Sequence, residues 1–250
     1  MTDPGLAPAA PPRALFLIAL LAFAADVLIF YFAVTPLDGW SMRTFGSSEW
    51  GILAGYGLRC ASAGIAAFAM VHFRAAAPAD LGLRFRPFAD DFRWTTRVVA
   101  ALLALSVVLM GIAVVVLRIL QPPLAGWPLE LRKSGGLFPY FLTSIVAAPL
   151  VEEFVYRGLL TPALLAGYGR RGAVLAGGLL FWVLHLVYDK PWWMVHYFAA
   201  GAILTWAFLR RGRLWICVVL HAGGNLLVIT DDLILKYAPD VFKALVGKLP

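Results

Sequence analysis

Long apolar runs separated by short polar segments make up most of the 250-residue chain. A helix needs about 20 apolar residues to cross the hydrocarbon core of a bilayer. Seven runs approach that length, at residues 14–34, 50–73, 97–120, 137–156, 173–188, 192–209 and 214–230. The pattern therefore predicts an all-α fold, a polytopic transmembrane helical bundle with about seven spanning helices.

The segments around these runs complete the predicted layout. Residues 1–13 are rich in Pro and Ala, which is typical of a disordered N-terminus. Residues 14–230 are expected to form a single transmembrane domain. Residues 231–250 mix apolar residues with Lys and Asp and predict an interfacial segment rather than an eighth span. The fourth run continues past Tyr156, and Pro162 is expected to bend or end its helix.

Composition supports a membrane protein. The chain is 62% hydrophobic and only 14% charged, whereas about 25% of the residues in soluble domains are charged. The net charge of +7 comes from basic residues scattered between apolar runs, as in membrane anchors, so membrane lipid and not nucleic acid is the expected partner. The loops on the N-terminal side of the membrane carry more of these residues, so we expect a multi-pass protein of a bacterial cytoplasmic membrane with a cytoplasmic N-terminus.

Three short polar clusters lie inside the apolar runs. An ionisable group in hydrocarbon is costly and usually functional. Residues four apart share a helix face, so Glu153 and Arg157 should pair, while Glu152 points roughly 140° away from Arg157. The alternative is that both glutamates pair with arginines such as Arg157 and Arg59, although Arg59 could also pair with Asp26 on the first helix. The clusters are Glu152, Glu153 and Arg157; His185; and His221 with Asn225.

The two histidine clusters repeat the same spacing. Phe181 lies four residues before His185, and His221 lies four residues before Asn225. At about 1.5 Å of rise per residue, both histidines and Glu152 fall at similar depths in the predicted spans. They could therefore meet in a cavity in the cytoplasmic half of the membrane or near its midplane, which favours a hydrolytic site. Either histidine alone would more often be a packing residue.

Four short motifs occur in order on consecutive predicted helices. They are EEFVYR from Glu152, FWVLH from Phe181, FAAG from Phe198 to Gly201, and HAGGN from His221. At these residues the sequence resembles the CPBP intramembrane proteases. This family is also called the CAAX-protease and bacteriocin-processing (Abi) family, and it includes the type II CAAX prenyl endopeptidases. The resemblance covers about 137–230, which is then the expected catalytic core, and the first 130 residues resemble nothing specific.

The resemblance implies an enzyme, an intramembrane endopeptidase, and a role for each motif residue. Glu152 and His185 would hold and activate the attacking water, and His221 and Asn225 would stabilise the oxyanion. The substrate would be a membrane-associated peptide or protein, such as a CAAX-like tail, a sorting tail or a bacteriocin-type precursor. The supporting residues would be Glu153, Arg157, Phe181, Phe198 and Gly201.

The sequence does not decide whether the site binds a metal ion. Glu152, His185 and His221 make a His₂Glu set, which resembles a catalytic zinc site with one open position. The chain has no H-E-x-x-H motif, and the same residues can act without a metal when the glutamate is the base. We prefer the metal-free mechanism, with zinc as the alternative.

The rival class is a non-catalytic membrane protein, either an immunity or scaffold protein of the same fold or a small-solute transporter. A transporter is expected to show repeat symmetry and broken helices in both halves, and neither is evident in the sequence. A scaffold would tolerate the loss of Glu152, whereas a protease would not.

Overall fold

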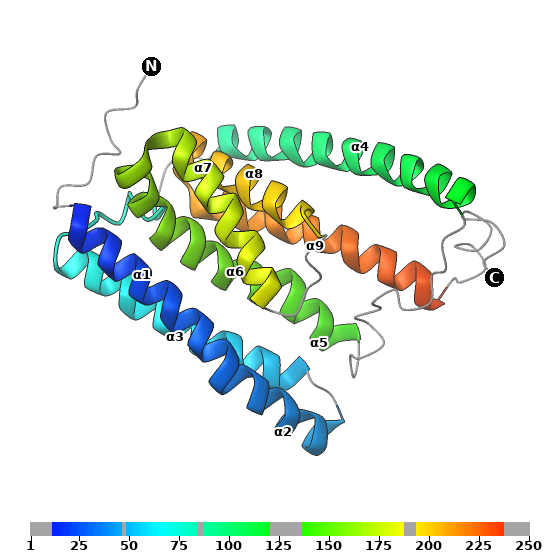
Figure 1. Cartoon of the computed structure of the whole chain (residues 1–250), viewed down its shortest axis with the longest axis horizontal. Coiled ribbons are helices and arrows are strands. Elements are labelled where there is room, and N and C mark those ends of the chain that lie inside the picture. The colour runs from blue at the N-terminus through cyan, green and yellow to red at the C-terminus, as the bar shows by residue number, and fades with distance from the viewer. Residues whose placement is uncertain (1–11, 47–48, 85–87, 121–136, 188–193, 238–250) are drawn as a thin grey trace.

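The computed structural model describes residues 12–46, 49–84, 88–120, 137–187 and 194–237. Within these ranges the regular structure is entirely helical (Figure 1), so the predicted all-α class is confirmed. Among the described residues, the helices long and apolar enough to cross a membrane cover Arg13–Phe45, Trp50–His72 and Leu142–Val187, and a shorter apolar helix covers Leu214–Thr230. Predicted spans four and five therefore merge into one run, and the expected number of seven spans is not confirmed.

The first half of the chain contributes a helical hairpin. The helical segments α1 (Pro12–Ile29), η1 (Phe30–Val34) and α2 (Thr35–Phe45) follow one another without a break, and α3 (Glu49–His72) runs back beside α1 (Figure 1). Glycines in α3 permit this approach, because a side chain at Gly51 would collide with the Leu37 backbone. The first helix, Arg13–Phe45, is longer than the predicted span 14–34.

The central segment carries the glutamate motif. It consists of α5 (Leu137–Phe141), the π-helical η3 (Leu142–Ala147), α6 (Ala148–Glu153), the π-helical η4 (Phe154–Leu160) and α7 (Thr161–Val187). Gly169 inside α7 has φ 66° and ψ −177°, and the chain reverses there (Figure 1). A bend or an end was predicted at Pro162; the helix does not end there, because Pro162 lies inside helical structure and the reversal comes seven residues later.

Prolines explain the π-helical segments of the described chain. The segments η1, η3 and η4 each end two residues before a proline, namely Pro36, Pro149 and Pro162. A proline cannot donate to the preceding turn and its ring crowds the carbonyl four residues back. Widening that turn into a π-bulge relieves the clash while the helix continues. This is why Pro162 fails to end the fourth helix.

The remaining helices close the bundle around α7. Helix α8 (His196–Arg211) packs along α7, where side chains at Gly177, Gly178 and Gly201 would overlap the opposing helix. Helix α9 (Leu214–Tyr237) follows α8 and packs on α6 and η3 as well. It continues to Tyr237, past the predicted end of the last span at residue 230, and residues 238–250 lie outside the described part of the chain.

Helix α4 (Phe88–Leu120) lies along one side of the bundle and contains the predicted span 97–120. Its N-terminal half packs against α8 and α9 through Trp94, Val98 and Leu102. Asp91 at this end is buried and pairs with Arg211, at 2.8 Å, and with Arg213. Helix α4 is therefore fixed to the α8–α9 turn by charge and by apolar contacts.

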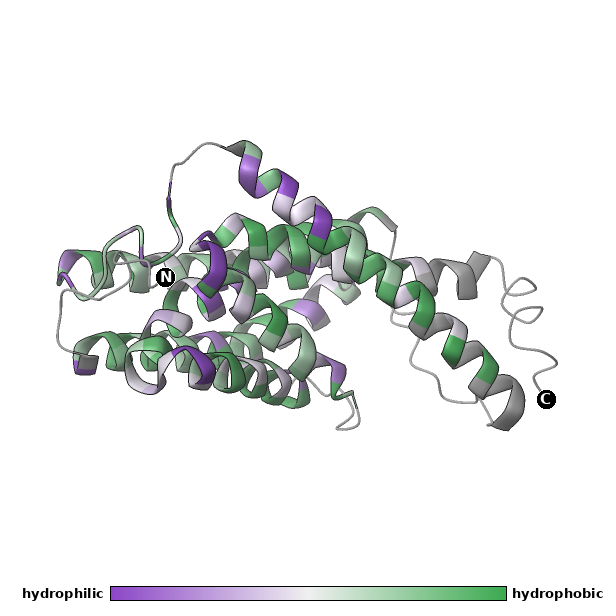
Figure 2. Cartoon of the chain, turned by 90° about the horizontal axis from the view of Figure 1, so that it is seen from above, coloured by the Kyte–Doolittle hydropathy of each residue, from purple (hydrophilic) through white to green (hydrophobic). Residues whose placement is uncertain are grey.

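Most of the helical ribbon is hydrophobic, and many of the hydrophilic residues lie near helix ends (Figure 2). Phe32, Ile65 and Phe68 are 78%, 70% and 70% exposed. Soluble monomers rarely expose apolar surface on this scale. Together with the spanning helices, this surface indicates an integral membrane protein whose outer side chains face lipid.

Candidate active site

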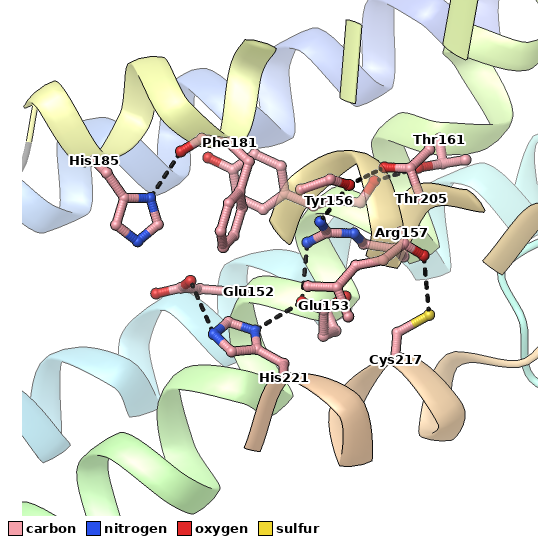
Figure 3. A network of polar contacts seen from close by, with 12 residues as sticks. Glu152, Glu153, Tyr156, Arg157, Thr161, Phe181, His185, Thr205, Cys217 and His221 are labelled. Atoms are coloured by element: carbon pink, nitrogen blue, oxygen red, sulfur yellow. Dashed lines mark hydrogen bonds and ion pairs between the residues drawn. The ribbon is translucent and has the colours of Figure 1, made fainter. Parts of the chain in front are cut away.

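The buried centre of the bundle holds a chain of ionic contacts that joins α6, η4 and α9 (Figure 3). Arg157 Nη1 donates to Glu153 Oε1 at 2.9 Å, and both side chains are fully buried. Arg157 Nη2 also donates to the Gly201 carbonyl of α8 at 3.1 Å. The pair expected from the i, i+4 spacing is thus present, and it neutralises one of the two glutamates.

His221 of α9 lies between the two glutamates. Its Nδ1 is 2.7 Å from Glu153 Oε1 and its Nε2 is 4.0 Å from Glu152 Oε2. A carboxylate that already binds Arg157 can only accept, so Nδ1 carries the hydrogen and donates it to Glu153. In the neutral ring Nε2 then presents its lone pair toward Glu152. Sequence reasoning had assigned Glu153 only to Arg157 and missed this second contact.

Glu152 has a different environment from its neighbour. It is buried at 5% exposure, and its carboxylate points into the space between His185 and His221 (Figure 3). Arg157 binds Glu153, and Arg59 is held by Asp26 through contacts of 2.7 and 2.8 Å. The alternative in which both glutamates pair with these two arginines is therefore wrong. The predicted Asp26–Arg59 pair is present instead.

His185 of α7 approaches Glu152 from the opposite side to His221 (Figure 3). Its Nδ1 donates to the Phe181 carbonyl at 2.7 Å, one helical turn earlier. Its ring stacks on Tyr197 of α8, with 3.8 Å between ring centroids and 19° between planes. These contacts fix the ring and leave Nε2 as the nitrogen turned toward the carboxylate. Tyr197 was not predicted from the sequence.

Asn225 lies one turn beyond His221 on α9. Its Nδ2 donates to the Ser144 carbonyl of η3 at 2.7 Å. The amide carries two hydrogens, so this bond orients the side chain and commits only one of them.

The F-x-x-G element of α8 supports the site from behind. A side chain at Gly201 would overlap Phe181 and the Gly177 carbonyl, so only glycine allows α8 this close to α7. The Gly201 carbonyl accepts hydrogen bonds from Arg157 and, at 2.8 Å, from Thr205. Phe198 covers Gly178 of α7. The supporting residues predicted from the motifs therefore hold the α7–α8 contact and Arg157.

The site can be compared with the requirements of a zinc centre. Each histidine donates from Nδ1 to a carbonyl or carboxylate and turns Nε2 inward, as metal-ligating histidines do. However, among the described residues no group of three His, Cys, Asp or Glu side chains lies at the spacing that a metal ion needs. As placed, Glu152, His185 and His221 do not form a ligand set, and no step below depends on a metal.

The fold and this cluster define a class, a polytopic membrane protein whose helical bundle holds a buried glutamate, a buried histidine and a second, partly buried histidine. Within it, residues 134–227 match the family described as type II CAAX prenyl endopeptidase, Rce1-like. The match includes the four motifs, which confirms the resemblance to the CPBP and CAAX proteases over this region and supports a protease embedded in the membrane. No curated protein and no solved structure matches the chain.

Proposed function

We propose that this protein is an intramembrane endopeptidase that hydrolyses a peptide bond in membrane-associated peptides or proteins, of CAAX-like, sorting-tail or bacteriocin type. The observation that carries the proposal is that two adjacent buried glutamates have different partners. Arg157 neutralises Glu153, whereas Glu152 faces two histidines. A structural pair needs only one of these carboxylates, so the second is available as a general base.

The geometry supports the following reaction. A water molecule between Glu152 and His185 donates one hydrogen to the carboxylate and the other to His185 Nε2. Glu152 removes the first proton as the water oxygen attacks the carbonyl carbon of the substrate. When the tetrahedral intermediate collapses, the C–N bond breaks and Glu152 returns that proton to the leaving amine. The remaining hydrogen of Asn225 is available to the oxyanion, and His221 donates from Nε2 only when it is doubly protonated.

The experiment is cleavage of a prenylated CAAX-type peptide by the purified protein in liposomes, followed by mass spectrometry of the released fragment. An unprenylated peptide of the same sequence, run in parallel, reports whether the lipid group is recognised. The Glu152→Gln variant serves as the matched inactive protein. A scaffold or transporter releases no fragment, and the family match favours neither rival.

We also propose that catalysis needs no metal. Under this proposal, protein treated exhaustively with a chelator keeps its activity and contains far less than one metal ion per chain by elemental analysis. Glutamate and histidine side chains suffice for the water activation described above. One tightly held zinc ion per active chain, whose removal stops cleavage and whose return restores it, would establish the His₂Glu alternative instead.

We propose further that the protein lies in a bacterial cytoplasmic membrane with its N-terminus in the cytoplasm. Residues 73–84, the Gly169 turn of α7 and the turn between α8 and α9 meet at one end of the bundle. The Arg84 side chain lies beside Gly212, and Arg170 donates to the Leu209 carbonyl. Basic loops gather on the cytoplasmic side.

Membrane-impermeant thiol labelling tests this orientation. In a background lacking Cys60 and Cys217, Arg170→Cys should react only from the cytoplasmic side and Arg43→Cys, at the far end of α2, only from the other. Both native residues are exposed, so both positions are accessible to the reagent. Labelling of Arg170→Cys from outside intact cells inverts the proposed topology.

A further inference from the structure

His185 lies in the last turn of α7, which ends at Val187. The last carbonyl groups of an α-helix have no partner within the helix, and terminal turns open more readily than the middle. The histidine that turns Nε2 toward Glu152 is therefore carried by the weakest part of its helix. Its bond to the Phe181 carbonyl, at 2.7 Å, joins the ring to α7 itself and does not fix that turn relative to Glu152 on α6.

A tyrosine of the N-terminal hairpin holds this turn from another helix. Tyr31 lies in the π-helical η1, and its hydroxyl donates a hydrogen bond to the Val187 carbonyl at 2.5 Å. One of the carbonyls at the end of α7 is thus satisfied by the first half of the chain, which lies outside the matched residues 134–227. Water does not compete for such a carbonyl inside a bilayer. A tyrosine that served only as a membrane anchor would turn its hydroxyl toward the lipid headgroups instead.

A second tyrosine covers the face of the histidine ring. Tyr197 lies near the start of α8, and its ring stacks on His185 with 3.8 Å between centroids and 19° between planes. Phe181 contacts the same imidazole at 4.6 Å and 52°. Phe181 belongs to α7, whereas the stack with Tyr197 ties the ring to a different helix. A ring packed flat on the imidazole opposes its rotation away from Glu152.

We propose that Tyr31 and Tyr197 are positioning residues of the candidate active site, which clamp the last turn of α7 so that His185 Nε2 stays directed toward the water activated by Glu152. Tyr31 acts through its hydroxyl and fixes the backbone of the turn. Tyr197 acts through its ring and fixes the imidazole. No proton moves through either residue. The inference rests on the proposed peptidase function and extends its site to the N-terminal hairpin.

The two tyrosines should respond differently to the same substitution. Tyr31→Phe keeps the ring but removes the bond to Val187, so kcat for the prenylated CAAX-type peptide should fall by about 2–10-fold, the effect of one hydrogen bond. Tyr197→Phe keeps the stacked ring and should retain the wild-type kcat. Tyr197→Leu removes the ring, and kcat should fall by about 10–100-fold because the histidine is misplaced. KM should stay unchanged in all three variants.

Hydrogen–deuterium exchange followed by mass spectrometry tests the clamp without any substrate. In Tyr31→Phe, the amides of residues 184–187 should exchange faster than in the wild type, while those of α6 keep their rate. The matched control is Tyr168→Phe, because Tyr168 is 63% exposed and lies beside the Gly169 reversal, far along α7 from its last turn. It should change neither exchange nor kcat. Melting curves in detergent show how much of each loss comes from unfolding.

Three results would overturn the clamp. The first is wild-type kcat together with wild-type exchange in Tyr31→Phe, which means that the bond to Val187 holds nothing. The second is an equal loss of kcat in Tyr197→Phe and Tyr197→Leu, which means that the stacked ring is not what matters. The third is a rise in KM at unchanged kcat, which indicates contact with the substrate.

The proposed function is judged separately. If the wild type cleaves the peptide and Glu152→Gln does not, the peptidase function stands whatever the tyrosine variants do. Absence of cleavage by the wild type overturns the proposed function and the catalytic purpose of the clamp with it. The exchange of residues 184–187 then still shows whether Tyr31 holds the end of α7.

Discussion

Replacing Glu152 by Gln should lower turnover of a cleaved peptide by about 10²–10⁴-fold, the usual contribution of a general base. The amide has the size and shape of the carboxylate but cannot accept the proton of the attacking water. Glu152 Oε2 lies 4.0 Å from His221 Nε2, which is beyond hydrogen-bonding distance. The variant should therefore fold as the wild type does and bind substrate with the same KM.

The measurement is steady-state cleavage by the two proteins in identical liposomes, with melting curves recorded for both. Glu49→Gln is the matched control, because it makes the same chemical change at the first residue of α3, outside the cluster. Near-normal turnover in Glu152→Gln would show that Glu152 is not the base of the mechanism.

The sequence predicted contacts within single helices better than contacts between them. The spacing of Glu153 and Arg157 placed both on one face, and a 2.9 Å ion pair joins them. The Asp26–Arg59 pair was predicted for a related reason, since a charge in an apolar helix needs a partner. In both cases the energy of an unpaired buried charge is large enough to restrict the possible structures.

The contact between His221 and Glu153 could not be found in this way. The two residues are 68 positions apart, and helical periodicity gives the direction of a side chain without saying which helix it faces. The same limit applies to Tyr197, which stacks on His185 from α8. These contacts depend on how the helices pack, which composition and spacing do not determine.

The interruptions of the helices were missed for a different reason. Pro162 was expected to bend or end the fourth helix. The helix continues instead, because the turn before the proline is widened into the π-helical η4. The reversal comes at Gly169, in a conformation that side chains disfavour. A widened turn before a proline lets a helix continue, and local sequence does not show whether that turn forms.

Replacing Glu153 by Gln should destabilise the protein by about 3–5 kcal/mol, the range for removing one partner of a buried ion pair. Arg157 would keep its positive charge in a fully buried position, with the Gly201 carbonyl as its remaining strong acceptor. Turnover should fall as well, because the carboxylate that holds His221 Nδ1 is lost. Unfolding by SDS in mixed micelles gives the stability change, and peptide cleavage below the unfolding transition gives the activity.

A double variant separates the two roles of Glu153. Combining Glu153→Gln with Arg157→Met removes both charges, and exchange of a buried ion pair for uncharged residues is often nearly neutral for stability. The double variant should therefore recover most of the lost stability. It should not recover turnover, because His221 still lacks the carboxylate that fixes its tautomer. Loss of a comparable carboxylate–histidine contact at a metal centre lowers activity by about 10–100-fold. Recovery of both properties together would mean that Glu153 only balances the charge of Arg157, and that His221 needs no carboxylate to act.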